Sequence, residues 1–294
     1  MKKNNLYFFI IVVLLLVCCS TLAFLYMNTK NEIGSLSNQI SNQTHQFDII
    51  KKKVEDTQWY NLVGDIAYID KVRLAGPPHH NPKKTNVPFF DKHLNNDVIF
   101  YSYVFIPKNI DINKQYPLIV FSHGGIHGDF SVVYSHVIKE LISQGYIIVA
   151  PDYRGSTGYG HGFWKRIDYG GRENEDVLAS RKYMIENYSI VDSTRVGALG
   201  WSHGGMISLM NILQYPDQYA CAYAGVPVSD VIYRLEYQKP SYSKLFSADY
   251  HIGQTVSENP EEYKRRSPVS YAKLLKRPLM ITTAENDDDV SVTE

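Results

Sequence analysis

The chain has 294 residues, of which 44% are hydrophobic and 13% aromatic, so it can bury one sizeable core. Its 30 basic and 30 acidic side chains cancel, and no stripe of Lys or Arg is present, so the charge pattern of a nucleic-acid-binding protein is excluded. Cys18 and Cys19 lie in an apolar segment, which leaves Cys221 alone in the rest and excludes an internal disulfide framework.

An almost unbroken apolar run extends from Leu6 to Met27. As a helix it would be about 33 Å long, enough to cross the hydrocarbon core of a bilayer. Lys2 and Lys3 precede the run and favour an N-terminus that stays in the cytoplasm. Residues 1–27 are therefore predicted to be a signal anchor, with one transmembrane helix and an extracytoplasmic domain.

Two other targeting signals are compatible with the same segment. A cleaved signal peptide would use the small residues Ser20 or Ala23 at its cleavage site and would release a secreted protein. A lipoprotein would be attached through Cys18 or Cys19, although neither follows the small residue that such a site favours. Both alternatives also place the domain outside the cytoplasm.

Residues 28–58 are polar but carry a regular apolar pattern. Apolar side chains and one glutamine recur at alternating spacings of three and four, as in the seam of a coiled coil. The seam residues are Ile33, Leu36, Ile40, Gln43, Phe47, Ile50 and Val54. The pattern predicts a stalk that pairs two copies of the chain through residues 33–54. A single amphipathic helix and a flexible spacer are the alternatives, because Gly34 and several Ser and Asn residues weaken a helix.

Residues 59–116 contain extended runs such as Val98–Pro107, rich in the β-branched and aromatic residues typical of strands. The loop that starts at Gly76 holds the neighbouring His79 and His80, which could ligate a metal ion. No carboxylate or cysteine at ligand spacing accompanies them, so the pattern favours a surface loop and no metal site.

From residue 118 onward, short apolar runs alternate with amphipathic stretches. The predicted strands are Leu118–Ser122, Tyr146–Ala150, Arg195–Leu199, Tyr219–Gly225 and Leu279–Thr283. The predicted helices are Val132–Ser143, Asp176–Asn187 and Gly204–Gln214. Buried strands interleaved with helices are typical of an α/β fold with a mostly parallel sheet and helices on both faces. We assign this domain to residues 59–294.

The sequence Gly200-Trp-Ser-His-Gly204 matches G-x-S-x-G, the nucleophile elbow. In an elbow a strand turns sharply into a helix and leaves the serine strained and exposed at the end of a sheet. Glycines at Gly200 and Gly204 would let the strand and the helix approach closely. The flanking segments, a short apolar run before and a helical apolar pattern after, favour an elbow over an ordinary glycine-rich turn.

Four segments together resemble the catalytic domain of the prolyl oligopeptidase family, whose members are α/β-hydrolase serine peptidases. They are His123-Gly-Gly, the run from Asp152 to Gly160, the elbow followed by Gly205, and Asp287-Asp-Asp-Val. The resemblance covers about Tyr60 to the last residue. The run Asp152–Gly160 is glycine-rich like a phosphate-binding loop, but it lacks the Gly-Lys-Ser/Thr ending of one.

The resemblance implies a role for each matching residue. Ser202 would be the nucleophile that forms an acyl-enzyme, and no cofactor would be needed. The backbone N–H groups of His203 and Gly125 would form the oxyanion hole. The side chain of His203 is expected to pack against the protein or to face solvent.

The orienting acid of the family lies in a loop near the end of the domain, in a pattern close to G-x-x-D-x-x-V. Here Ala284 replaces the glycine, and Asp287 lies three residues before Val290. Asp287 is therefore the predicted acid, with Asp288 and Asp289 as alternatives. A run of three aspartates is otherwise an ordinary solvated loop.

The catalytic base is the missing member, because this fold orders its triad Ser, Asp, His. All ten histidines precede Asp287, and the histidine of the family would follow Glu294. We prefer the explanation that the sequence is a truncated form of a longer enzyme. A degenerate non-enzyme, or recruitment of His251 or His127, are the alternatives. A truncated sheet would also expose an apolar edge at the last predicted strand.

The predicted function is hydrolysis of short peptides through an acyl-enzyme on Ser202. The roughly 60 residues before the sheet cannot build the β-propeller that filters substrates in larger members of the family. A carboxylesterase of the same fold is the alternative enzyme. A catalytically silent binding domain held at the membrane is the alternative outside enzymes.

Overall fold

The computed structural model describes residues 2–78 and 97–294. His79 and His80 lie outside these residues, so the choice between a metal site and a loop stays a prediction. The chain divides into two compact units, Met1–Phe47 and Asp48–Glu294. The second unit contains every candidate catalytic residue.

Helix α1 (Lys2–Val63) includes residues 2–47 of the first unit. Its N-terminal part is long and apolar enough to cross a membrane, a property that a signal sequence shares. Residues 28–58 are helical, and the choice between a stalk, a single amphipathic helix and a spacer stays a prediction. The apolar seam residues are all exposed in the single chain, and their pairing with a second copy stays a prediction.

The C-terminal end of α1 packs inside the second unit. Lys52, Glu55, Trp59 and Val63 are buried and recur every three or four residues, so they share one face of the helix. The Trp59 ring stacks on the Phe130 ring, with the ring centroids 5.7 Å apart and a 14° angle between the planes. Residues 48–58, which the sequence assigns to a linker, therefore contribute to the packing of the catalytic domain.

In the described residues one sheet of seven strands forms the centre of the second unit, in the order β1-β2-β4-β3-β5-β6-β7. The strands are β1 (Ala67–Pro78), β2 (Asp97–Pro107), β3 (Tyr116–Ser122), β4 (Ile147–Asp152), β5 (Val191–Trp201), β6 (Cys221–Gly225) and β7 (Leu279–Thr282). β1, β2 and β4 pair antiparallel, and β4, β3, β5, β6 and β7 pair parallel. The mostly parallel sheet is confirmed.

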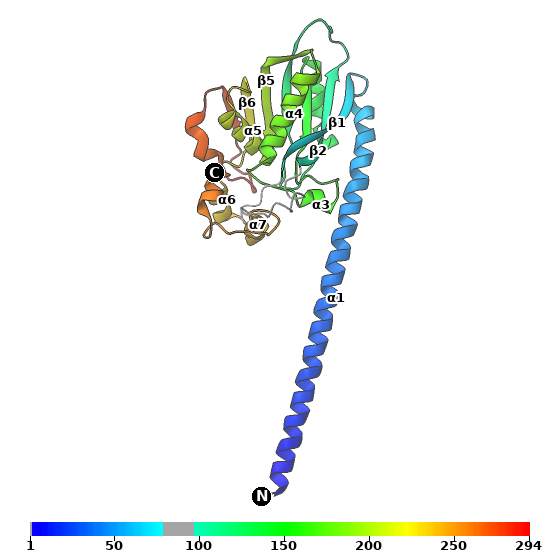
Figure 1. Ribbon diagram of the computed structural model, residues 1–294, viewed down its shortest axis with the longest axis vertical. Helices are drawn as coiled ribbons and strands as arrows, with labels where there is room; N and C mark the ends of the chain where they lie inside the picture. Colours follow the sequence, from blue (N-terminus) through cyan, green and yellow to red (C-terminus); the bar gives the residue numbers. More distant parts are fainter. Residues whose placement is uncertain (1, 79–96) are drawn as a thin grey trace. The chain divides into compact units, whose positions relative to one another are not determined.

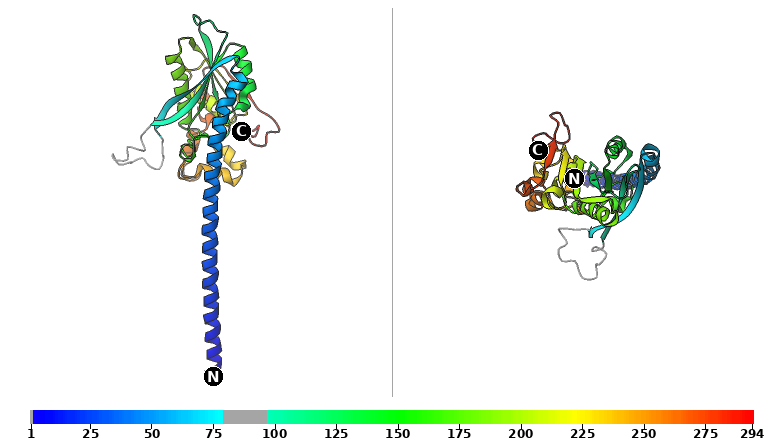
Figure 2. Two further views of the ribbon diagram at one scale, coloured as in Figure 1. Left: turned by 90° about the vertical axis from the view of Figure 1, so that its right-hand side faces the viewer. Right: turned by 90° about the horizontal axis from the view of Figure 1, so that it is seen from above.

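Helices cover both faces of the sheet (Figures 1 and 2). Helices α4 (Glu173–Asn187) and α5 (His203–Gln214) pack on one face, together with Val149 and Val120. The end of α1 and helix α2 (Ser135–Ser143) pack on the other, with Ile148 and Phe121. Successive strand residues point to opposite faces, so each central strand serves two cores.

The remaining helical segments lie in the connections between strands. The 3₁₀ turn η2 (Val132–Tyr134) precedes α2, and α3 (His161–Trp164) follows β4. The segment between β6 and β7 contains α6 (Val231–Tyr237), α7 (Pro240–Phe246), α8 (Pro260–Arg265) and the 3₁₀ helix η3 (Pro268–Leu274). This segment packs on Met206 and Met210 of α5 in a third apolar cluster.

Strand β7 is an edge strand in the described sheet, next to β6. Met280 and Ile281 of β7 are more than half exposed. The expected apolar edge is therefore present.

Glu55 predicts a pH-dependent stability for this unit. Burial raises the pKa of Glu55 from its ordinary 4.5 to about 7, with Asp129 adding to the rise and Lys51 and Lys52 opposing it. A raised carboxyl pKa stabilises the fold fully below about pH 4.5, and this contribution disappears as the pH rises through 7. Glu55→Gln should melt at the parent temperature at pH 5 and about 2–4 °C above it at pH 8.

The matched control is Glu186→Gln, which removes an exposed carboxylate of α4. Thermal melts at the two pH values should then show no pH-dependent difference from the parent. An equal change at pH 5 and pH 8 in Glu55→Gln would contradict the assignment.

Candidate active site

Ser202 lies at a sharp turn between β5 and α5. Strand β5 ends at Trp201, α5 begins at His203, and Ser202 between them has φ 55° and ψ −120°, which is strained for a residue with a Cβ. The Ser202 N–H donates to Gly225 O at 2.9 Å, and Ser202 O accepts from the Met206 N–H at 2.9 Å. The predicted nucleophile elbow is thus present in the backbone.

Two glycines make this turn sterically possible. A Cβ on Gly204 would lie 2.1 Å from Ser122 O, and one on Gly200 would lie 2.3 Å from Gly204 O. The obstacles are backbone atoms of β3 and α5, which cannot move aside as a flexible side chain can. Only glycine therefore lets α5 begin this close to the ends of β3 and β5.

Gly204→Ala should consequently lower stability by about 1–3 kcal/mol, because the added methyl forces the end of β3 away from α5. Gly162→Ala in α3 is the matched control, since a Cβ there meets no atom within 4 Å. Thermal melts of the two variants measure the difference. Equal melting temperatures would show that the elbow is not tightly packed.

The His123-Gly-Gly loop lies directly against the nucleophile. A Cβ on Gly124 would lie 3.5 Å from the Cβ of Ser202 and 2.9 Å from Trp201 O. Gly125 has φ +82°, a conformation that favours glycine, and its N–H has no hydrogen-bond partner among the described residues. The first-turn N–H of His203 likewise precedes the repeating bonds of α5. These are the two N–H groups that the sequence assigns to the oxyanion hole, a role that stays a prediction.

The His203 side chain is fully buried, so of the two expected placements it takes the packed one and not the solvent-facing one. Its Nε2 lies 3.1 Å from Glu173 Oε1, and its Nδ1 lies 3.2 Å from Gly125 O. The ring also stacks on Tyr169, with centroids 4.0 Å apart. His203 thereby joins α4 to the loop that carries Gly125.

Asp287 forms a turn after β7. Its Oδ1 accepts hydrogen bonds from the N–H groups of Asp289 at 2.9 Å and Val290 at 2.8 Å, and these bonds lower the pKa of Asp287. Its Oδ2 has no hydrogen-bond partner among the described residues, so it can still orient a base. Asp289 instead ion-pairs with Arg234, 3.0 Å away, and accepts from the Tyr242 hydroxyl. The geometry favours Asp287 over Asp289 as the acid, and the role stays a prediction.

Both ring nitrogens of His251 make hydrogen bonds within the domain. Nε2 accepts the Tyr169 N–H at 3.0 Å, so Nδ1, 3.3 Å from Leu245 O, carries the proton. Burial lowers the pKa of His251 to about 3. A base needs a lone pair within reach of the serine proton, and that of His251 is used by Tyr169. The Nδ1 of His127 lies 2.9 Å from Gly155 O, and its ring stacks on Trp164 with centroids 3.7 Å apart.

A second serine and histidine pair is present but serves packing. His123 Nε2 lies 2.9 Å from Ser156 Oγ, and Ser156 in turn donates to Tyr153 O at 2.6 Å. Both side chains are fully buried, and burial lowers the pKa of His123 to about 4. No substrate carbonyl can reach this serine.

The run Asp152–Gly160 is held in place by buried polar contacts. Arg154 is fully buried and binds Asp176 of α4 through two bonds, Nη2 to Oδ1 at 2.6 Å and Nε to Oδ2 at 2.7 Å. Arg154 also donates to Pro77 O of β1 at 2.8 Å. The guanidinium of Arg154 is thus paired with groups of the protein itself, in keeping with the argument against a phosphate-binding loop.

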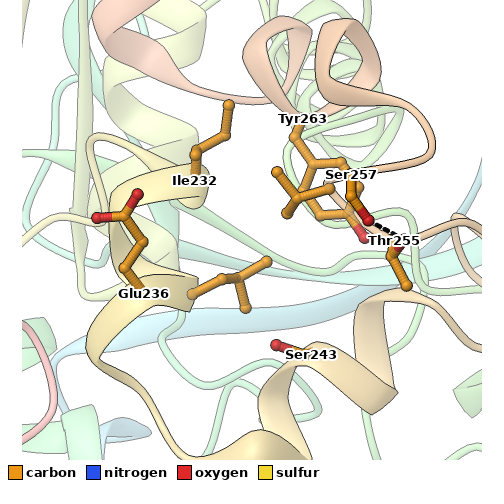
Figure 3. A pocket seen from close by; sticks show the side chains of 8 residues that line it. Ile232, Glu236, Ser243, Thr255, Ser257 and Tyr263 are labelled. Atoms are coloured by element: carbon orange, nitrogen blue, oxygen red, sulfur yellow. Dashed lines mark hydrogen bonds between the residues drawn. The ribbon is translucent and has the colours of Figure 1, made fainter.

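A cavity of about 460 Å³ opens within the segment between β6 and β7. In Figure 3, Ile232 and Glu236 of α6 face Thr255, Ser257 and Tyr263 across it. None of the candidate catalytic residues lines this cavity. Among residues 2–78 and 97–294, no group of three His, Cys, Asp or Glu side chains is arranged to hold a metal ion.

Known proteins with similar sequences are peptidases. The chain is 30% identical over 184 residues to an uncharacterized peptidase, YuxL, of Bacillus subtilis, covering 62% of this chain and 27% of the relative. It is 27% identical over 248 residues to the acylamino-acid-releasing enzyme of Mus musculus, covering 80% and 32%. The human dipeptidyl peptidase 8 is 32% identical over 163 residues, covering 53% and 18%. The chain thus spans about a third or less of the length of these relatives.

Solved structures show the same fold. The acylaminoacyl peptidase of Pyrococcus horikoshii superposes with a TM-score of 0.63 at 22% identity, covering 79% of this chain and 35% of that one. A puromycin-hydrolyzing peptidase of Mycobacterium tuberculosis has a TM-score of 0.63 at 25% identity, covering 76% and 32%. The α/β-hydrolase fold expected from the sequence is confirmed.

The family model described as the prolyl oligopeptidase family matches residues 132–294, which is more than half of the chain. The matched residues include the elbow at Ser202 and the turn at Asp287. The chain therefore belongs to the prolyl oligopeptidase family of serine peptidases.

Proposed function

We propose that this protein hydrolyses short peptides through an acyl-enzyme on Ser202. The observation that carries the proposal is the strained backbone of Ser202 at the strand-to-helix turn, with the Gly124-Gly125 loop against it. In this mechanism Ser202 Oγ attacks the scissile carbonyl, and the amine leaves as the acyl-enzyme forms. The N–H groups of His203 and Gly125 stabilise the oxyanion, and Asp287 orients the base. Water then releases the acid product and restores Ser202.

We propose further that the base is a histidine outside the 294 residues. The hydrogen bonds of His123, His203 and His251 support this, because each ring is held by partners other than Ser202. Without a base the serine hydroxyl is unactivated, and only the oxyanion hole and binding would accelerate the reaction.

The proposed location is a membrane, with the catalytic domain on its extracytoplasmic side. The apolar N-terminal part of α1 and the preceding Lys2 and Lys3 support an anchor with this orientation. We also propose that two copies pair through residues 33–54. Ile50 and Val54 are exposed, whereas Lys52 and Glu55 on the opposite face of α1 are buried, so pairing would not disturb the catalytic domain.

Matched substrates distinguish the candidate activities. An acylated peptide anilide and the corresponding ester would be given to the extended chain, meaning the 294 residues with the sequence that follows Glu294. A peptidase hydrolyses both, and a carboxylesterase hydrolyses only the ester because an amine is the harder leaving group. Hydrolysis of neither, with no labelling of Ser202, would favour the silent binding domain.

A further inference from the structure

Lys52 of α1 reaches the loop that carries Gly125. Its side chain is 3% exposed, and its ammonium lies 2.7 Å from Asp152 Oδ2 and 3.1 Å from Asp129 Oδ2. The third donor is used on Phe130 O at 2.8 Å. Burial alone would lower the pKa of Lys52, but Asp152 and Asp129 raise it, so the group stays charged.

Two of the three partners of Lys52, Asp129 and Phe130, form the far end of the oxyanion loop, residues 123–130. The Phe130 N–H donates to Asp152 Oδ1 at 2.6 Å, so one aspartate holds both Lys52 and the loop. The Gly128 N–H bonds Gly125 O at 3.3 Å. The bonds of Lys52 therefore hold Asp129 and Phe130, which directly follow Gly128, the residue that closes the turn at Gly125.

Lys52 also compensates two buried carboxylates. Asp152 is fully buried, and Asp129 is largely buried beside it. Removing the ammonium would leave these carboxylates without a counter-ion and Phe130 O without its donor, so the loop would lose the bonds that hold its far end in place. Oxyanion donors must lie about 2.7–3.1 Å from the oxygen that they stabilise, so a small displacement of Gly125 matters.

We propose that Lys52 is a positioning residue that sets the location of Gly125 relative to Ser202. The inference rests on the proposed function of Ser202. It makes the end of α1, which continues from the apolar N-terminal segment, a structural part of the oxyanion hole. Lys52 itself touches no substrate in this account.

The test compares Lys52→Met, which keeps the apolar stem and removes the charge, with Lys51→Met in the extended chain. Lys51 is the matched control, because it is half exposed and lies 3.7 Å from Glu55. Lys52→Met should lower kcat by about 10²-fold and change KM by less than about threefold. It should weaken the binding of a peptide boronic acid by a similar factor, because the adduct of this inhibitor with Ser202 is tetrahedral. Lys51→Met should have the kcat, the KM and the boronic acid affinity of the parent.

A second variant separates positioning from stability. Lys52→Met combined with Asp129→Asn removes the charge repulsion but leaves Phe130 O without the hydrogen bond from Lys52, so it should recover much of the lost melting temperature but not kcat. Recovery of both would show that Lys52 acts only through stability and would overturn the proposal. So would a folded Lys52→Met variant with kcat and boronate affinity within about twofold of the parent.

Hydrogen exchange of the 294-residue chain tests the loop without any need for activity. Amides of residues 123–130 should exchange faster in Lys52→Met than in Lys51→Met, while those of α5 should not change. Unchanged exchange in the loop overturns the positioning role. An extended chain with no substitution that neither turns over substrate nor binds the boronic acid, together with the exchange difference in the 294-residue chain, would instead disprove the function proposed for Ser202.

Discussion

Ser202→Ala should lower kcat/KM of the extended chain for a peptide anilide by about 10⁶-fold. Alanine keeps the Cβ, so the elbow and its hydrogen bond from the Ser202 N–H to Gly225 O remain. What is lost is the oxygen that forms the acyl-enzyme, and only the oxyanion hole and binding still act on the substrate. Initial rates at substrate concentrations below KM measure the effect directly.

Ser208→Ala is the control for this prediction. Ser208 lies in the same helix, is buried, and donates to Gly204 O at 2.9 Å, so its replacement perturbs α5 without removing the nucleophile. We expect kcat/KM within about tenfold of the parent. If Ser202→Ala kept more than about a hundredth of the parental kcat/KM, Ser202 would not be the nucleophile.

Arg154→Met should lower the stability of the domain by about 3–5 kcal/mol, because it leaves Asp176 as a buried, unpaired charge. Both partners are fully buried, and Arg154 also joins α4 to Pro77 of β1. Thermal melts at pH 7 provide the measurement. The matched control, Arg195→Met, breaks the surface pair with Asp192 and should cost far less stability than Arg154→Met.

The pH dependence of this loss identifies its cause. Burial raises the pKa of Asp176 even with Arg154 beside it, and removal of Arg154 raises that pKa further. Protonated Asp176 carries no charge, so the difference between Arg154→Met and the parent should shrink as the pH falls from 7 to 4. A loss that equals that of Arg195→Met at every pH would contradict the buried-pair account.

Much of the fold was predictable from sequence because the central strands are apolar on both faces. The predicted strands all form, with ends that differ by a few residues, and the helix predicted for 132–143 divides into a 3₁₀ turn and α2. Helix α4 begins at Glu173 rather than Asp176. Its first turn is polar yet buried, since Glu173 bonds His203 and Asp176 binds Arg154, so apolar spacing gives no sign of it.

The packing of α1 was not predictable for a similar reason. The apolar pattern predicts contacts through Ile50 and Val54, which are exposed, whereas the buried face of the helix carries Lys52 and Glu55. Buried charges contradict the usual pattern of a helix face, and their partners Asp129 and Asp152 lie far away in sequence. Trp59 and Val63 are the conventional apolar signals for this contact.

The site was predictable where local sterics dictate the residue. Gly200 and Gly204 each meet a backbone atom, so the motif itself implies the strand-to-helix turn. The choice among three consecutive aspartates depends on their contacts, because Asp287 forms the turn and Asp289 pairs with Arg234. Only the structure shows these contacts. The buried bonds of the His203 side chain depend equally on α4, which lies thirty residues earlier.

The most direct test of the account is fluorophosphonate labelling of the purified 294-residue chain beside the extended chain, each with and without Ser202→Ala. The reagent reacts with an activated serine, so it reports the nucleophile and its base together. We predict labelling of the extended chain alone, and only with Ser202 intact. Labelling of the 294-residue chain at the same rate would mean that an internal histidine is the base. Absence of labelling in both chains would contradict the assignment of Ser202 as a catalytic nucleophile.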